Sequence, residues 1–186
     1  ESPMLAELVA AGELPPVDER LPENPLVVEV VDQIGEYGGT WRRWNDHPRI
    51  FAWEPLVKVD IDGSYHPNVA ESWEISSDKR TYTFHLRRGI KWSDGEPYTT
   101  KDIMFFWEDL ARNEEFTDRS PGMVGPGATL TAPDDYTLVI EFPDPQPTFM
   151  ARQSIQWGGL GFVFSAYPAH YLEQFHPKYA DADELA

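Results

Sequence analysis

The sequence predicts an α+β protein in which an antiparallel meander of strands is covered by one helix. Two observations support this fold class. Between residues 55 and 92, and again between residues 135 and 142, apolar and polar side chains alternate, as along a strand with one buried face. Between these stretches, residues 100–112 place apolar side chains at helical spacing. The length of 186 residues suits one ordinary domain or parts of two.

The first 25 residues predict a short helix and then an extended segment. Apolar residues between Met4 and Val9 recur at helical spacing, and Gly12 can end the helix. Because proline lacks a backbone N–H, the segment that follows should lie extended on a surface; its prolines are at positions 15, 16, 22 and 25. Residues 26–31, LVVEVV, then predict a short strand that is buried on both faces.

We expect the strands of one antiparallel sheet at residues 55–61, 71–77, 80–88 and 135–142. Asp62 and Gly63 mark a turn after the first of them. The alternation is clearest after Arg80, where one predicted face carries Tyr82, Phe84, Leu86, Ile90 and Trp92. The other face of that strand would then carry Thr83, His85, Arg87 and Lys91.

The helix is predicted to begin after Thr99 or Thr100, since threonine is a good N-cap, and Asp102 suits its first turn. Its apolar stripe contains Ile103, Phe106, Trp107, Leu110 and Ala111, and it should cover the sheet face that presents Phe84, Leu86 and Leu138. The opposite side contains Lys101, Glu108 and Asp109. Phe105 falls among these charges, and we expect it to pack on a neighbouring loop.

Composition excludes several classes of protein. A net charge of −17 disfavours nucleic acid and anionic membrane surfaces as partners. The chain has no cysteine, so it forms neither disulfides nor thiolate metal sites. No apolar run approaches the ~20 residues of a membrane-spanning helix. With 41% hydrophobic and 13% aromatic residues, the chain can nevertheless bury a core.

Residues for catalysis or metal binding are few. His170 and His176 are six positions apart, which does not suit two metal ligands on one helix face. Asp94 and Glu96 flank Gly95 and could aim two carboxylates the same way, as a glycosidase requires, although a turn is the simpler interpretation. The sequence contains neither a G-x-S-x-G elbow nor a phosphate-binding loop. We therefore predict no metal and no cofactor.

The segment from Glu54 to Leu110 closely resembles the extracellular solute-binding proteins of family 5, the oligopeptide-, dipeptide- and nickel-binding proteins of ABC importers. Several motifs occur in the family's order: AESW, then Asp78, then YTFHLRRGIKW and SDGEPYTTKDI. The later YPAHYLEQFHPKYA looks like the family's return segment, and the N-terminal residues resemble one subgroup of larger members.

The resemblance implies a two-lobed receptor that closes on its ligand, of which this chain would contain part. Residues 1–25 would be an N-terminal extended segment, and residues 26–50 would begin lobe I, an α/β lobe of the periplasmic-binding-protein type. Residues 51–149 would form an extra subdomain with the meander and helix. Residues 150–186 would return to lobe I, and the second lobe would be absent from these residues.

The implied function is that of the substrate-binding component of an ABC importer, which delivers a peptide or similar small solute to a membrane permease. Such a protein is not an enzyme, and we expect a monomer in the periplasm or at the cell surface, with the signal peptide absent from this chain. Ligand contacts are expected at the edges of the lobe I segments, at Trp44, Asn45, Trp157, Gly158 and Gly159. The alternatives are a hydrolase that uses Asp94 and Glu96, or a stand-alone protein-interaction module.

Overall fold

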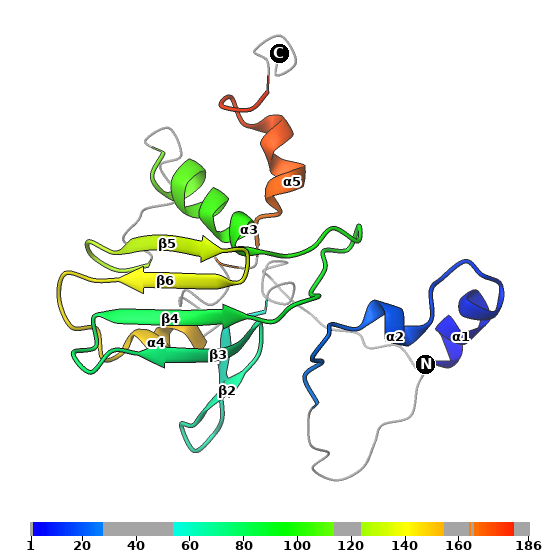
Figure 1. Cartoon of the computed structure of the whole chain (residues 1–186), viewed down its shortest axis with the longest axis horizontal. Coiled ribbons are helices and arrows are strands. Elements are labelled where there is room, and N and C mark those ends of the chain that lie inside the picture. The colour runs from blue at the N-terminus through cyan, green and yellow to red at the C-terminus, as the bar shows by residue number, and fades with distance from the viewer. Residues whose placement is uncertain (1, 28–53, 114–123, 155–163, 165, 181–186) are drawn as a thin grey trace, which may run out of the picture.

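The computed structural model describes residues 2–27, 54–113, 124–154, 164 and 166–180. Within them, a four-stranded antiparallel sheet has the order β3-β4-β6-β5 (Figure 1). Its strands are β3 (Ala70–Ile75), β4 (Thr81–Leu86), β5 (Thr129–Asp134) and β6 (Thr137–Glu141). A separate hairpin pairs β1 (Val57–Val59) with β2 (Tyr65–Pro67).

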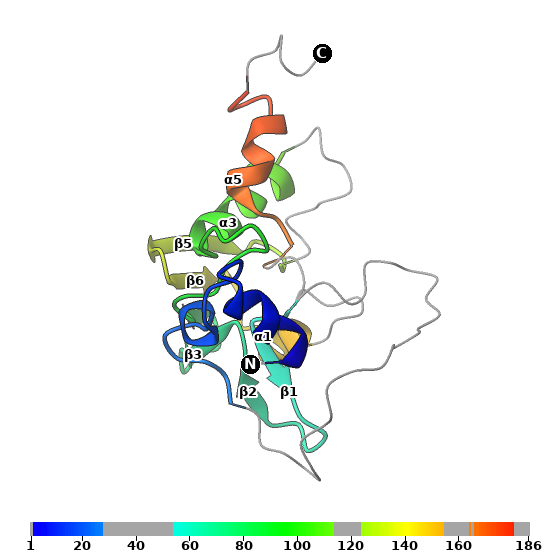
Figure 2. The same ribbon diagram turned by 90° about the vertical axis from the view of Figure 1, so that its right-hand side faces the viewer.

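The described helices are short. Two belong to the N-terminal segment, α1 (Pro3–Ala10) and α2 (Val17–Arg20). The others are α3 (Thr100–Phe105), which continues as the π-helix η1 (Phe106–Ala111), then α4 (Phe149–Ser154), α5 (Ala169–Leu172) and the 3₁₀ turn η3 (Glu173–Phe175). Figures 1 and 2 show α4 behind the sheet and α5 beyond its β5 edge. No described helix is long and apolar enough to cross a membrane.

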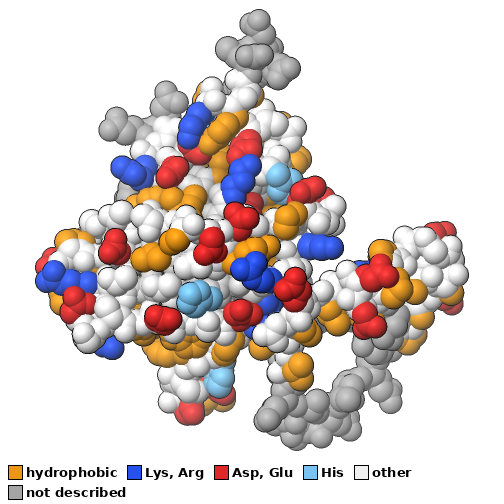
Figure 3. Space-filling view, viewed as in Figure 1, with side chains coloured by type: hydrophobic (Ala, Val, Ile, Leu, Met, Phe, Trp, Pro, Cys, Tyr) orange, Lys and Arg blue, Asp and Glu red, His pale blue; other side chains and the backbone are white. Residues whose placement is uncertain are grey.

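The buried face of the sheet is the one that the alternation predicts. Along β4 the odd and even positions differ in burial, with Tyr82, Phe84 and Leu86 almost inaccessible. Leu138 pairs with Phe84 across the sheet and is also buried. Figure 3 shows acidic and basic side chains interspersed over the face seen in Figure 1. The predicted antiparallel sheet with one packed and one wet face is therefore confirmed.

The capped helix with a buried apolar stripe is also confirmed, and α3 lies against the edge strand β5. Thr99 accepts a hydrogen bond from the helix backbone while the Asp102 carboxylate accepts one from the Thr99 N–H, which makes a capping box. All five residues of the predicted stripe are buried, Trp107 at 3% exposure, and Glu108 is exposed. The face that contains Phe84 has a cover that we did not predict, because the Phe149 ring of α4 lies 6.4 Å from the Phe84 ring.

The order of the strands differs from the prediction in two ways. The predicted strand at 55–61 does not join the main sheet, because the turn at Asp62 and Gly63 folds it back onto β2. The edge strand β5 was not predicted, and its six residues include Pro133, which is tolerated at a sheet edge. The chain leaves β4, passes through α3 and η1, and only then forms the β5–β6 hairpin.

Two charged residues that we expected on solvent-exposed faces, one of the strand and one of the helix, are buried. Arg87 is only 5% exposed, because its guanidinium donates to the backbone carbonyls of Asn68, at 3.2 Å, and of Asn24. Asp109 is 6% exposed, because Lys178 and Tyr179 from the end of the chain bind its carboxylate. Partners distant in sequence thus reversed the orientation that periodicity predicts.

The N-terminal helix is confirmed as α1, capped by Ser2, and Gly12 follows it with a φ of +73°. The short helix α2 was not predicted. Residues 26–31 were predicted to form a strand that is buried on both faces. Its first two residues, Leu26 and Val27, lie in no strand, and Val27 is 84% exposed. The remainder of that predicted strand lies outside the described residues.

Candidate functional site

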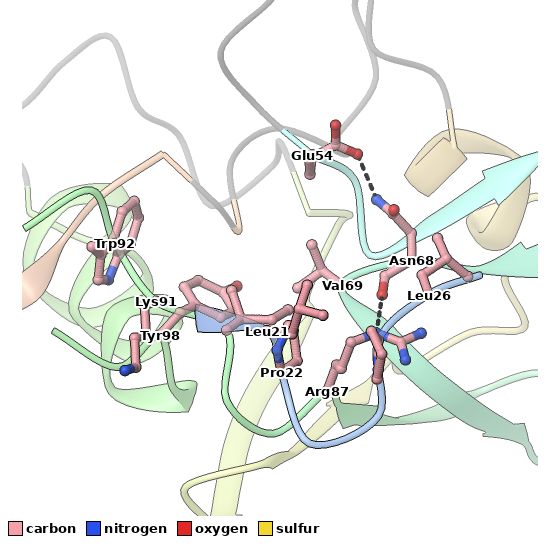
Figure 4. A pocket seen from close by; sticks show the side chains of 12 residues that line it. Leu21, Pro22, Leu26, Glu54, Asn68, Val69, Arg87, Lys91, Trp92 and Tyr98 are labelled. Carbon is pink, nitrogen blue, oxygen red and sulfur yellow. Dashed lines mark hydrogen bonds between the residues drawn. The ribbon is translucent and has the colours of Figure 1, made fainter. Parts of the chain in front are cut away.

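A cavity of about 410 Å³ lies between the N-terminal segment and the connection from β4 to α3 (Figure 4). Leu21 and Pro22 form part of one wall, and Trp92 and Tyr98 form part of another. Val69 contributes an apolar surface between them. The volume falls in the range of sites for small molecules, roughly 300–1,000 Å³.

The wall with Trp92 is built by a tight, locally bonded loop. Lys91 and Pro97 form a β-bridge, and the backbone N–H of Trp92 donates to the backbone carbonyl of Glu96 at 2.8 Å. Gly95 closes the turn with a φ of +96°, which favours glycine. The loop brings the Trp92 and Tyr98 rings to a centroid distance of 5.5 Å, edge to face. Sequence alternation had instead placed Trp92 on the extended face of β4.

Tyr98 is held rigidly in this wall. It is 3% exposed, and its hydroxyl donates to the carbonyl of Phe164 at 2.5 Å. Burial raises the pKa of Tyr98, so its hydroxyl stays protonated and remains a donor. The ring therefore offers the cavity an apolar surface, while its polar group is already used.

The opposite wall is tied down by Arg87 and by a close backbone approach. The guanidinium of Arg87 joins the N-terminal segment to the residues before β3, through the carbonyls of Asn24 and Asn68. At Gly89, whose φ is +83°, an added Cβ would lie 3.0 Å from the Cα of Pro22. A side chain at this position would push the N-terminal segment away from the sheet.

The polar groups around the cavity are not all partnered. The indole nitrogen of Trp92 is buried and has no hydrogen-bond partner in the described part of the chain. The Asn68 amide nitrogen donates to Glu54 at 2.9 Å and to the carbonyl of Pro55 at 2.7 Å. Glu54 is also paired with Lys58 at 3.1 Å. Donor and acceptor groups thus occur on different parts of the same cavity wall (Figure 4).

The five ligand-contact residues predicted from the sequence, Trp44, Asn45, Trp157, Gly158 and Gly159, lie outside the described residues. Their role stays a prediction. No sequence motif marked Trp92 and Tyr98 as site residues. The signal that could have identified them is the pair of glycines at 89 and 95 with Pro97, which interrupts the strand pattern after Leu86.

Asp94 and Glu96 lie in an exposed turn, and neither lines the cavity. Asp94 bonds the His170 ring at 2.7 Å and accepts the Glu96 N–H at 3.2 Å. The hydrogen bond with His170 is the main cause that lowers the pKa of Asp94. A general acid needs a raised pKa, so Asp94 is unsuited to that role. The described residues also contain no cluster of three metal-ligating side chains.

A second polar cluster joins the end of the chain to the helix. Lys178 and Tyr179 each bind the Asp109 carboxylate at 2.7 Å, and the Asp102 carboxylate accepts the Ala169 N–H at 2.8 Å. The hydrogen bond with Asp109 is the main cause that raises the pKa of Lys178. Both aspartates are partnered, so this cluster holds residues 166–180 in place. Phe105 packs here against the rings of His176 and Tyr179, as predicted for a neighbouring loop.

Comparison with known proteins places the chain in a family. Residues 64–185 match the family described as bacterial extracellular solute-binding proteins, family 5 Middle. The chain belongs to that family, whose members are solute-binding proteins of transporters. The family named from the sequence is thereby confirmed.

Among curated relatives, the periplasmic alpha-galactoside-binding protein of Rhizobium meliloti is 35% identical over 94% of this chain and 29% of its own length. The periplasmic oligopeptide-binding protein OppA of Haemophilus influenzae is 36% identical over 50% of this chain and 20% of its own length. The chain therefore spans less than a third of the length of these relatives.

Solved structures agree with the fold. An oligopeptide-binding protein OppA superposes on 99% of this chain and 29% of its own, with a TM-score of 0.85 and 43% identity. The periplasmic binding protein MelB of Agrobacterium fabrum C58, in complex with stachyose, superposes on 97% of this chain and 31% of its own, with a TM-score of 0.77 and 32% identity. The mixed helix-and-sheet architecture is that of periplasmic binding proteins.

Proposed function

We propose that the protein is the substrate-binding component of an ABC importer, which captures a small solute in the periplasm and delivers it to a membrane permease. The superposition of nearly the whole chain on an OppA structure, at a TM-score of 0.85, is the observation that carries this proposal. The family match over residues 64–185 supports it independently. The protein would act by binding and hinge closure, as a monomer and without catalysis.

The solute would be a peptide or an oligosaccharide. Relatives named for oligopeptide binding support a peptide. An alpha-galactoside-binding relative and a structure in complex with stachyose, which both match more than nine-tenths of this chain, support an oligosaccharide. We propose that residues 26–50 and 150–186 contribute to lobe I, and that Trp44, Asn45, Trp157, Gly158 and Gly159 contact the solute there.

The hydrolase alternative is less consistent with a chain that belongs to a family of solute-binding proteins. The interaction-module alternative is less consistent with a chain that superposes throughout on solute receptors.

Calorimetric titration of the intact protein with stachyose and with a panel of tri- to pentapeptides tests the proposal. We expect saturable binding of one of the two classes without turnover of the solute. Release of cleaved product from either class, or failure to bind any member of both, would contradict it.

A further inference from the structure

Residues 169–180 expose large aromatic side chains to solvent. Tyr171 is 52% exposed, Phe175 56% and Tyr179 47%. The rings of Tyr171 and Phe175 meet edge to face, with their centroids 5.4 Å apart, and are here called the aromatic face. Among the described residues, the next most exposed Tyr, Phe or Trp is Tyr65, at 36%. Single exposed apolar side chains are ordinary, whereas adjoining ones mark a surface that packs against a partner.

The same segment is held on its other side by α3 and η1. The Asp102 carboxylate accepts the Ala169 N–H at 2.8 Å, and the buried His176 ring bonds the Asp109 carbonyl through Nε2 at 3.2 Å. In Figures 1 and 2, α5 stands beyond the β5 edge with α3 beside it. The aromatic face is therefore exposed on a docked segment of fixed orientation, not on a loose end of the chain.

The charged side chains of the segment already have partners. Glu173 pairs with Lys101 at 3.1 Å, and Lys178 pairs with Asp109 at 2.7 Å. A charged partner would have to compete with these ion pairs, and a chain with a net charge of −17 repels an acidic one. Removal of the rings from water remains the main gain when the aromatic face is covered. The surface that covers it should therefore be apolar.

The lengths of the relatives indicate where that surface comes from. The matched part covers 29% of the alpha-galactoside-binding relative, and the superposed part covers 29% of the OppA chain. In a protein of that length, most of the polypeptide lies outside these 186 residues. Because it is covalently joined to the aromatic face, its effective concentration there is high. A separate partner would instead leave the rings in water whenever it dissociates.

We propose that the aromatic face, Tyr171 and Phe175, is a docking surface for an apolar part of the same polypeptide outside these 186 residues. The inference rests on the proposed function, because it takes the intact protein to have the length of its relatives. Residues 166–180 then act as a two-sided connector. Their polar contacts bind α3 and η1, and their aromatic face binds the remainder of the receptor.

The test is the reaction of single cysteines with a maleimide in the intact protein. Phe175→Cys is compared with Ile61→Cys, which is fully exposed in the turn of the β1–β2 hairpin. Each rate is divided by the rate of the same variant in urea, and peptide mapping assigns the label. We expect Phe175→Cys to react at least about 10-fold more slowly, because a covered thiol reacts only through local opening. If Phe175→Cys does not fold, Tyr171→Cys replaces it.

A stability measurement checks the same contact without a label. Phe175→Ser should lower the melting temperature of the intact protein by about 4 °C or more, because it removes a ring from an apolar contact. Ile61→Ser is the matched control, since it also replaces an apolar side chain with serine but at a position that stays in water. It should change the melting temperature by less than about 2 °C.

The outcomes separate this inference from the proposed function. Equal reaction rates at the two positions would show that the aromatic face is open, and the inference would be wrong. Protection that appears only at high protein concentration would assign the face to a second copy, and protection only with permease-containing vesicles would assign it to the permease; either result overturns the inference. Titration of the same protein with stachyose and peptides tests the proposed function separately. Solute binding with an open face leaves that function standing, whereas a protected face without solute binding refutes it alone.

Discussion

Four aspartates at turns use the same short-range geometry. Each accepts the backbone N–H of the residue two positions later at 2.8–3.2 Å: Asp62 from Ser64, Asp78 from Arg80, Asp94 from Glu96 and Asp134 from Tyr136. The pKa of each carboxyl is lowered, mainly by a hydrogen bond. The donor is the Ser64 hydroxyl for Asp62 and the Ser76 hydroxyl for Asp78. It is the His170 ring for Asp94 and the backbone N–H of Tyr136 for Asp134. The bond to the residue two positions later needs no distant partner, which is why sequence can predict such turns; only Asp94 adds a distant one, His170.

We predict that Asp78→Asn makes stability less dependent on pH in the acid range. The pKa of Asp78 is lowered on folding, so its contribution is fully present above the ordinary value of 3.8 and is lost as pH falls through the lower folded-state value. Asparagine can still accept the hydrogen bonds from Ser76 and Arg80 but does not titrate. Urea unfolding between about pH 7 and pH 2 should show the wild type losing more stability than the variant.

The control for this prediction is Asp144→Asn, since Asp144 is exposed and accepts no hydrogen bond from a described residue. It should follow the wild-type pH dependence. Parallel curves for wild type and Asp78→Asn would show that the turn geometry at Asp78 has no energetic consequence.

Phe84→Ala should destabilise the protein by about 3–5 kcal/mol, because it removes a fully buried ring and leaves a cavity. Phe84 is 0% exposed and lies between Trp73 and Leu138 in the sheet register. Thr83→Ala on the other face should lower the free energy of unfolding by less than about 1 kcal/mol. Equal losses for the two variants, measured by urea unfolding, would refute the assignment of the buried face.

At the scale of elements, the helix depends on contacts at both its ends. The capping box at Thr99 is a local feature that the sequence predicts. The docking of residues 166–180 is different, because Asp102 and Asp109 accept bonds from residues about 70 positions later. The return segment is recognisable in the sequence only by its resemblance to the family, and no local pattern predicts these partners.

Asp109→Ala should release residues 166–180 from the helix while the sheet stays folded. The variant removes the acceptor for Lys178 and Tyr179, so both donors lose the bond that ties the segment to the helix. Hydrogen exchange should accelerate at the amides of Leu172 and Tyr179, which are bonded within the segment, and not in β4. Glu108→Ala is the matched control, since Glu108 is the exposed neighbour; acceleration in both variants would count against the docking role of Asp109.

At the scale of the whole molecule, we predict that the 186-residue chain alone binds its solute much more weakly than a two-lobed protein of the relatives' full length, which is here called the intact protein. The matched part covers only 29% and 20% of the two curated relatives, and ligand pockets enclose about 70–90% of the ligand surface. If the intact protein binds at ~1 μM, a chain that keeps part of those contacts still bears most of the association penalty, so its Kd should be millimolar or weaker. Calorimetry with the same solute measures both; micromolar binding by the short chain would rule out a cleft shared between two lobes.

The sequence by itself determined the features whose causes lie within a few residues. The period of two in β4 and β6 identified the buried face that contains Phe84, and Thr99 with Asp102 located the start of the helix. The ordered motifs between Glu54 and Leu110 were enough to recognise the family. These signals are reliable because a strand face, a helix cap or a tight turn is stabilised by neighbours in the chain.

Only the tertiary structure decided which distant segments meet. Periodicity placed Arg87 and Asp109 in solvent, yet both are buried because backbone carbonyls and a lysine from remote segments satisfy them. Periodicity also assigned residues 55–61 to the main sheet and Trp92 to a strand. In the structure, β1 instead pairs with β2 in a separate hairpin, and Trp92 lies in the loop that Gly95 closes. The cavity beside Trp92 arises from the same cause: its walls belong to segments more than 60 residues apart, and no local pattern encodes their contact.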